Sequence, residues 1–339
     1  MEKFKAILKK GFKRYGLDAL SAMALGLFAS LIIGLILSQL AKIPYLGFLG
    51  AYAEVLGAQS PVVGAAIGVA VAWGLKASPL AMFSCAGVGA FGYNLGGPVG
   101  CFFAAVVGAE LGRLVSGKTK VDIVLVPIVT IVSGGLVGQF IGPGVSALMT
   151  GLGNFINVAT QMQPIPMGIL VSASMGMILT APISSAALAI SLNMSGLAAG
   201  AATVGCSTQM IGFAVASYRE NKMGGLIAQG LGTSMLQVSN ILKNPRIWIA
   251  PTLASAILGP LSTTIFAMTN NPAGAGMGTS GLVGQIGTWA TMAGTDPAWL
   301  LIGKILLLHF ILPAILTLLI DWVMRKIGWV KDGDMKLEL

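Results

Sequence analysis

Long apolar runs, separated by short polar or charged turns, make up most of this chain. A helix that crosses a membrane needs about 20 mostly apolar residues, and the runs that begin near Asp18 and Pro297 reach that length. The apolar runs between them are shorter and rich in glycine, which favours tilted, broken or re-entrant helices. The pattern predicts an all-α membrane protein with about ten transmembrane helices and re-entrant hairpins.

Two stretches of the chain repeat the same order of prolines and glycines. Each stretch has two prolines eighteen residues apart, then a Gly-Cys pair, then a proline followed eight residues later by a glycine. We interpret this order as an internal duplication that gives two parallel repeats of four helices each. The matched landmarks are Pro61 and Pro79 with Pro164 and Pro182, Gly100-Cys101 with Gly205-Cys206, and Pro127 with Pro251.

The repeats divide the chain into segments and predict where it crosses the membrane. The expected crossings are 61–76, 79–93, 95–113 and 121–142 in the first repeat, and 164–181, 182–197, 199–218 and 247–268 in the second. The segments are a cytoplasmic amphipathic helix (1–17), a first transmembrane helix with an external segment (18–60), repeat 1 (61–143), an external connector (144–163), repeat 2 (164–268) with an inserted hairpin (223–243), a re-entrant hairpin (269–297), a last transmembrane helix (298–326) and a cytoplasmic tail (327–339).

Charge supports this organisation. Only 9% of the residues are charged and 55% are hydrophobic, whereas an ordinary globular protein has about 25% charged residues, so lipid must cover most of the surface. Lysine and arginine stay on the cytoplasmic side of a membrane, and their positions place both termini there. Six of the basic residues fall within the first fourteen positions, which is typical of a helix lying on an anionic membrane rather than of a nucleic-acid-binding arm.

The segment from Thr269 to Pro297 is the strongest candidate for a binding site. Its glycines and prolines argue against a regular helix, and its apolar residues argue against a plain loop. Uncharged amides and hydroxyls both donate and accept hydrogen bonds, so they suit a hydroxyl-rich solute; an external loop with an interfacial tryptophan is the alternative. The candidate solute-binding residues are Asn270, Asn271, Thr279, Ser280, Gln285 and Trp289, with Thr208, Gln209, Asn193 and Asn94 from other crossings, where helix-to-helix hydrogen bonds are the alternative role.

Ionisable groups inside membrane segments are candidates for proton coupling. His309 lies deep in the last apolar run, and Pro313 removes the amide that would bond its carbonyl. Glu54 lies in the external segment. A neutral packed histidine and a solvated glutamate are the alternatives. A single histidine and the absence of any nucleophile with its base leave no metal site, cofactor or enzymatic activity to predict.

The stretches Thr180–Gly225 and Ile249–Thr288 carry a resemblance to a known family. They read TAPISSAALAISLNMSGLAAGAATVGCSTQMIGFAVASYRENKMGG and IAPTLASAILGPLSTTIFAMTNNPAGAGMGTSGLVGQIGT. The chain resembles the membrane subunit IIC of the bacterial sugar phosphotransferase system, and within it the stand-alone IIC-like group that includes the perfringolysin regulator PfoR. The resemblance implies a homodimer in the bacterial cytoplasmic membrane, with a solute site between a scaffold part and a mobile part.

The resemblance also implies a transporter for a sugar or similar small polar solute. Any phosphoryl transfer would need separate IIA and IIB proteins, because no such domain is present in the sequence. The glucose-type Gly-Ile-Thr-Glu motif, whose glutamate binds the sugar, is absent, and amides stand in the corresponding region. The alternatives to a transporter are a membrane sensor or regulator with the same fold, and a channel-like pore. The expected partners are a carbohydrate and membrane lipid, with no nucleic acid.

Overall fold

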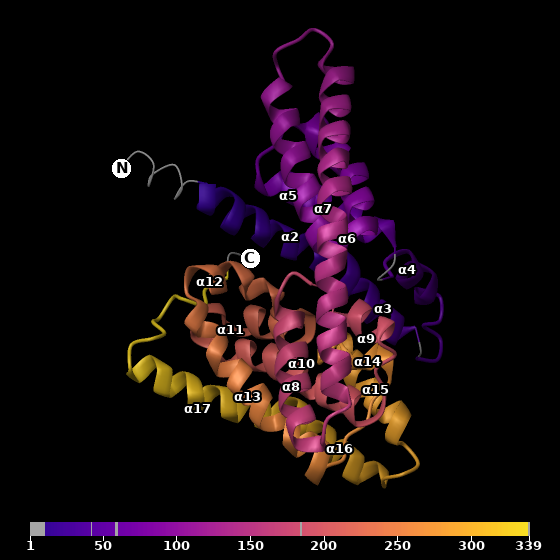
Figure 1. Ribbon diagram of the computed structural model, residues 1–339, viewed down its shortest axis with the longest axis vertical. Helices are drawn as coiled ribbons and strands as arrows, with labels where there is room; N and C mark the ends of the chain where they lie inside the picture. Colours follow the sequence, from indigo (N-terminus) through magenta and orange to yellow (C-terminus); the bar gives the residue numbers. More distant parts are fainter. Residues whose placement is uncertain (1–10, 42, 58–59, 184, 338–339) are drawn as a thin grey trace. The chain divides into compact units, whose positions relative to one another are not determined.

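The computed structural model describes residues 11–41, 43–57, 60–183 and 185–337, which form two compact helical units (Figure 1). Unit 1 comprises Met1–Ser38 and Tyr45–Met149, and unit 2 comprises Gln39–Pro44 and Thr150–Leu339. The described residues contain isolated β-bridges and no named strand, which confirms the all-α prediction. Most of the expected amphipathic helix 1–17 lies outside the described residues.

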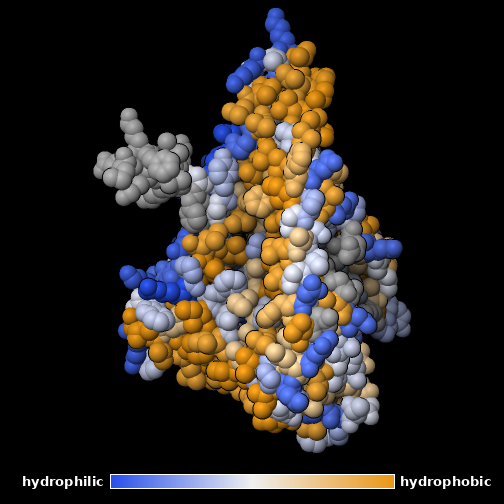
Figure 2. All heavy atoms as spheres, viewed as in Figure 1, coloured by the Kyte–Doolittle hydropathy of each residue, from blue (hydrophilic) through white to orange (hydrophobic). Residues whose placement is uncertain are grey.

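Six helices of the described chain are long and apolar enough to cross a membrane, so the protein is a multi-pass membrane protein. Two shorter apolar helices, Pro61–Gly74 and Pro164–Thr180, accompany them. Figure 2 shows hydrophobic side chains over much of the visible surface, with hydrophilic side chains at the loop that joins α6 and α7. The six candidate spans are Lys13–Ser38, Pro79–Val115, Asp122–Thr160, Gly196–Ala216, Pro245–Ile265 and Ala298–Lys326.

Unit 1 begins with the first predicted transmembrane helix, which is interrupted by π-helical turns. Unit 1 also contains a helical hairpin within α6 (Pro79–Val115), because the backbone of Gly96 and Gly97 is not helical. Cys85 and Ala105 would lie far apart in a straight helix, yet the Cys85 thiol is 3.9 Å from the Ala105 carbonyl. The two arms are therefore antiparallel, as expected for 79–93 and 95–113. The other elements of unit 1 are η1 (Phe12–Ala19), α2 (Leu20–Leu27), η2 (Phe28–Ile32), α3 (Ile33–Leu40) as far as Ser38, α4 (Leu49–Val55), α5 (Pro61–Gly74) and α7 (Asp122–Thr160) as far as Met149.

Helix α7 (Asp122–Thr160) continues through the segment expected to be an external connector. A connector was expected over 144–163, whereas the structure is helical through Pro143 and up to Thr160. Apolar residues recur at helical spacing beyond the proline, at Val145, Leu148, Leu152 and Ile156, and this periodicity favours a continuing helix.

The centre of unit 2 consists of α8 (Pro164–Thr180), α10 (Gly196–Ala216) and α13 (Ile249–Pro260). Helices α8 and α10 run in the same direction, because Gly176 lies against Gly205 and Thr180 bonds to Gln209. The chain must therefore return between them. It does so through α9 (Ser185–Ser191) and the turns around it, so the segment expected to cross over 182–197 is not a continuous helix, because seven helical residues span only about 10 Å.

Two broken hairpins pack against α10. Hairpin A, residues 218–243, comprises α11 (Tyr218–Ile227), η3 (Ala228–Gly232), η4 (Ser234–Gln237) and α12 (Val238–Lys243). Hairpin B, residues 270–292, comprises α14 (Pro272–Ala275), η7 (Ser280–Leu282) and α15 (Val283–Met292). The remaining elements of unit 2 are η5 (Pro245–Trp248), η6 (Leu261–Ile265), α16 (Ala298–Leu306), η8 (Leu307–Ile311) and α17 (Leu312–Lys326).

The C-terminal tail is part of the fold rather than a free extension. Met335 is 1% exposed, and its carbonyl accepts hydrogen bonds from Asn221 and Gln237, one on each arm of hairpin A. Asn240 donates to the carbonyl of Lys336. The tail therefore fastens the two arms of hairpin A, a role that its polar sequence did not predict.

Gly205 tests the close packing of α8 on α10. A Cβ at this position would overlap the backbone carbonyl of Ser172 on α8, so the two helices would have to separate. We expect Gly205→Ala to destabilise the purified protein by about 1–3 kcal/mol, the usual cost of overpacking, measured by thermal unfolding in detergent. Gly303→Ala is the matched control, because a Cβ there meets nothing within 4 Å. Equal melting temperatures for the two variants would contradict this packing.

Candidate functional site

The tips of the two hairpins meet beside the middle of α10. The Thr279 hydroxyl at the tip of hairpin B donates to the Gly230 carbonyl at the tip of hairpin A, at 2.5 Å. The Ser234 hydroxyl, also on hairpin A, lies 2.8 Å from that of Thr180 at the end of α8. Each of these residues is buried. The irregular backbone of both hairpins therefore meets beside the midpoint of α10, which is a candidate membrane span.

Close backbone packing places hairpin B. Gly278 has φ +53°, and a Cβ on it would overlap Cys206 and Ser207 of α10, so only glycine fits there without strain. The Ser185 hydroxyl on α9 donates to the Gly276 carbonyl at 2.6 Å. Helix α9 thus supplies a hydrogen bond that the broken backbone of the hairpin cannot form within itself.

Two of the predicted site residues hold hairpin B together. The Asn270 amide nitrogen lies within hydrogen-bonding distance of Thr203, the Gly284 carbonyl and Thr288, at 2.7, 2.9 and 3.2 Å. Its oxygen accepts from the backbone of Asn271, so protein groups already occupy both ends of this amide. The Asn271 oxygen accepts from the backbone nitrogen of Gly274 and so caps α14.

Gln285 and His309 form a second polar group at the same level of unit 2. The Gln285 amide nitrogen is 3.1 Å from Nδ1 of His309 and 3.5 Å from the Ser207 hydroxyl. His309 lies in the π-helical turn η8, just before Pro313, and such turns are frequent at functional sites. The histidine is fully buried.

Two atoms of this group have no hydrogen-bond partner within the described part of the chain. They are Oε1 of Gln285 and Nε2 of His309. Leaving a buried polar atom without a partner costs about 1–3 kcal/mol, so such atoms call for an explanation. Turning the Gln285 amide over would exchange its oxygen and nitrogen but would still leave one end unpaired. We name Ser207, Gln285 and His309 the central polar cluster.

Thr208 and Gln209 face other groups. The Gln209 oxygen accepts from Thr180 and Trp248, and its nitrogen donates to Thr252, so its hydrogen-bonding capacity is used within the protein. The Thr208 hydroxyl donates to Val204 in its own helix. Thr279 is occupied by hairpin A, as described above. These three positions are buried. Gln209 and Thr279 join helices and hairpins, whereas Thr208 bonds within its own helix.

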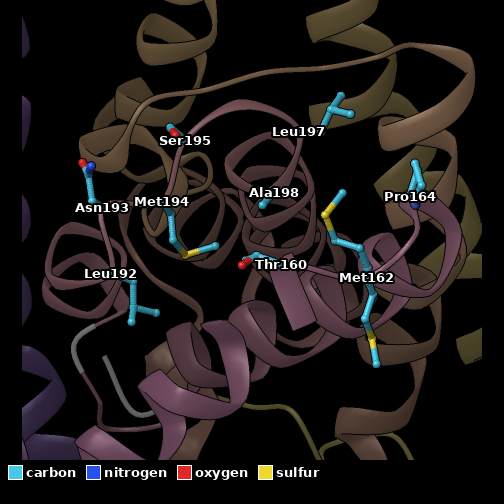
Figure 3. A pocket seen from close by; sticks show the side chains of 10 residues that line it. Thr160, Met162, Pro164, Leu192, Asn193, Met194, Ser195, Leu197 and Ala198 are labelled. Carbon is cyan, nitrogen blue, oxygen red and sulfur yellow. The ribbon is translucent and has the colours of Figure 1, made fainter. Parts of the chain in front are cut away.

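Asn193 lies apart from the central polar cluster, in a cavity at the start of α10. The cavity has a volume of about 440 Å³, and Figure 3 shows Asn193, Met194 and Ser195 on one wall, with Met162 and Pro164 on another. Asn193 has φ +49° and is exposed. The cavity adjoins the base of hairpin B, since the Asn270 backbone bonds to Gly196.

The other candidates are not brought to the cluster. Trp289 is 39% exposed on α15. Asn94 and Glu54 are exposed residues of unit 1. Conversely, the structure adds residues that the sequence did not single out as site residues, notably Ser207, Gly230 and Thr180. Of these three residues, only Ser207 had a signal in the sequence, because it directly precedes the candidates Thr208 and Gln209.

The central polar cluster is uncharged apart from the titratable imidazole. Charged side chains of unit 2 pair elsewhere: Lys304 with Asp296 at 2.7 Å, and Arg325 with Asp321 at 2.7 Å. No group of three or more potential metal ligands occurs among the described residues. The arrangement can therefore offer donors and acceptors to a neutral polar molecule, and it offers no carboxylate.

The comparisons with known proteins assign the chain to a family. The family model described as "Phosphotransferase system, EIIC" matches residues 17–337. No curated protein and no solved structure matches the chain. The match includes α10, both hairpins and His309, and it confirms the resemblance seen in the sequence. The chain therefore belongs to the EIIC family of phosphotransferase-system membrane proteins.

Proposed function

We propose that this protein carries a sugar or a similar small polar solute across the cytoplasmic membrane of a bacterium. The observation that supports this function best is the central polar cluster, in which one buried amide oxygen and one buried imidazole nitrogen have no partner in the described chain. A sugar hydroxyl both donates and accepts, so it can satisfy such atoms. Membership of the EIIC family supports the same class of solute.

The two hairpins suit this role. In many transporters the solute site is formed near the middle of the membrane by discontinuous helices. We propose that hairpin B enters the membrane from the outside and hairpin A from the cytoplasm. The basic residues Arg219, Lys243 and Arg246 at the base of hairpin A support this orientation, because lysine and arginine stay on the cytoplasmic side. The cavity beside Asn193 would then be an external vestibule.

We further propose that the chain itself performs no chemical step. Phosphoryl transfer, where it accompanies transport, would be carried out by separate IIA and IIB proteins. His309 keeps the role expected from the sequence, a candidate for proton coupling, and its contact with Gln285 makes it also a candidate solute ligand. A homodimer remains the expected assembly.

Replacing Gln285 tests the solute site. We expect Gln285→Leu to weaken sugar binding about tenfold, because it removes about one net hydrogen bond to the solute. The sugar would first be selected from a panel of monosaccharides, disaccharides and hexitols by thermal shift of the detergent-purified protein, and its affinity measured by titration calorimetry. Asn271→Ser is the matched control, since serine also caps a helix, and its affinity should stay normal.

Two results would contradict this assignment. Normal affinity in Gln285→Leu would remove the central polar cluster from the solute site. A protein that binds the sugar but shows no counterflow in proteoliposomes would contradict the carrier function. That result would favour the alternative of a membrane sensor, which the sequence analysis also allowed.

The bond between Thr279 and Gly230 tests whether the hairpin tips act as a gate. Thr279→Val keeps the shape of the side chain and removes this bond, which is worth about 1 kcal/mol. If transport requires the tips to separate, the variant should exchange sugar several-fold faster in proteoliposome counterflow, with affinity little changed. Thr264→Val is the control, because that hydroxyl bonds only to a carbonyl of its own helix. Equal exchange rates in folded Thr279→Val and wild-type protein would refute the gate.

A further inference from the structure

The ends of α10 and α17 enclose a groove that is separate from the central polar cluster. Its volume is about 820 Å³. One part of it is apolar, and the other part is charged. The lining residues of the apolar part are Val215, Ala216, Ile315, Leu318, Leu319 and Trp322, and those of the charged part are Arg219, Asp321, Arg325 and Lys326.

The apolar part is a stripe along one side of α17. Ile315, Leu318, Leu319 and Trp322 recur at helical spacing and are each 45–57% exposed. They belong to the candidate membrane span Ala298–Lys326, so hydrocarbon is their natural surrounding. Trp322 lies close to the end of this span, where tryptophan is typical of the boundary between membrane and water.

The charged part carries two cations, Arg219 and Lys326, that have no hydrogen-bonded partner among the described residues, although Arg219 also interacts electrostatically with Asp321. Arg325 is fully engaged, because it bonds to Asp321 and Asp332 at 2.7 Å and to Glu220 at 3.3 Å. The carboxylate of Asp321 is therefore neutralised by its ion pair with Arg325. Arg219 and Lys326 form no hydrogen bond or ion pair with any described residue; Lys326 instead lies 3.8 Å above the ring of Trp322.

We propose that this groove binds an anionic phospholipid of the membrane leaflet at the basic end of unit 2. The headgroup phosphate would lie between Arg219 and Lys326, and one acyl chain would lie along the stripe of α17. Charge complementarity selects an anion, and the apolar stripe selects a lipid over a free phosphate. A phosphorylated protein partner fits less well, because every lining residue except Arg219 belongs to a candidate membrane span.

Binding would be measured by native mass spectrometry of the detergent-purified protein. The probes are phosphatidylglycerol, phosphatidylcholine with the same acyl chains, and glycerol 3-phosphate as a headgroup without a tail. We expect the wild-type protein to retain phosphatidylglycerol at least tenfold better than phosphatidylcholine, since each basic side chain near an anionic surface contributes about 1 kcal/mol.

The double variant Arg219→Gln/Lys326→Gln should lose this preference, and Lys243→Gln should keep it. Lys243 is an exposed cation at the same end of unit 2 that does not line the groove, so it controls for the overall charge. Unchanged thermal unfolding of the double variant in phosphatidylcholine would show that it is folded. The proposal is overturned if the double variant keeps the preference, if Lys243→Gln loses it equally, or if glycerol 3-phosphate displaces the lipid at comparable concentration.

Discussion

The need to satisfy broken backbone inside the protein governs the structure of unit 2. Helices α14 and η7 are too short to pair the carbonyls of hairpin B within themselves, and a carbonyl left bare in hydrocarbon costs several kcal/mol. Side chains of other elements supply the missing partners: Ser185 bonds to Gly276, and Thr279 bonds to Gly230 across the two tips. Each such bond requires close approach, and glycines such as Gly205 and Gly278 permit it.

The same constraint divides the polar side chains into two classes. Asn270, Asn271 and Gln209 are hydrogen-bonded to protein groups and give the hairpins and α10 their geometry. The central polar cluster is different, since Gln285 and His309 each keep an atom without a described partner. In the proposed solute site, the first class would hold the geometry rigid and the second would bind the solute. Preorganisation of this kind lowers the entropic cost of binding.

The sequence predicted those features that depend on local pattern. Apolar runs located the last helix and the first one, and the glycines and prolines of 269–297 predicted a broken hairpin, because both signals act within a few residues. The course of the chain between α8 and α10 depends on the direction in which those helices pack, which no local pattern encodes. The packing of the C-terminal tail on hairpin A was not predicted for a similar reason. The carbonyls of the tail bond to Asn221, Gln237 and Asn240, which lie about a hundred residues away in the sequence. Asn270 and Gln285 looked equivalent in sequence, because an amide whose atoms are all bonded to the protein and an amide with an unpaired oxygen have the same chemistry.

The meeting of the hairpin tips is the central claim, and a cross-linking experiment tests it most directly. Cysteines would replace Gly230 and Thr279 in a protein whose native Cys85, Cys101 and Cys206 are alanine, and a short bifunctional thiol reagent would be applied to membranes. The account predicts that this pair is joined efficiently, as detected by mass spectrometry of peptides, whereas a pair at Gly230 and Gly303 is not. It would be contradicted if the tips stayed unlinked while a membrane-impermeant maleimide added from outside labelled both positions freely.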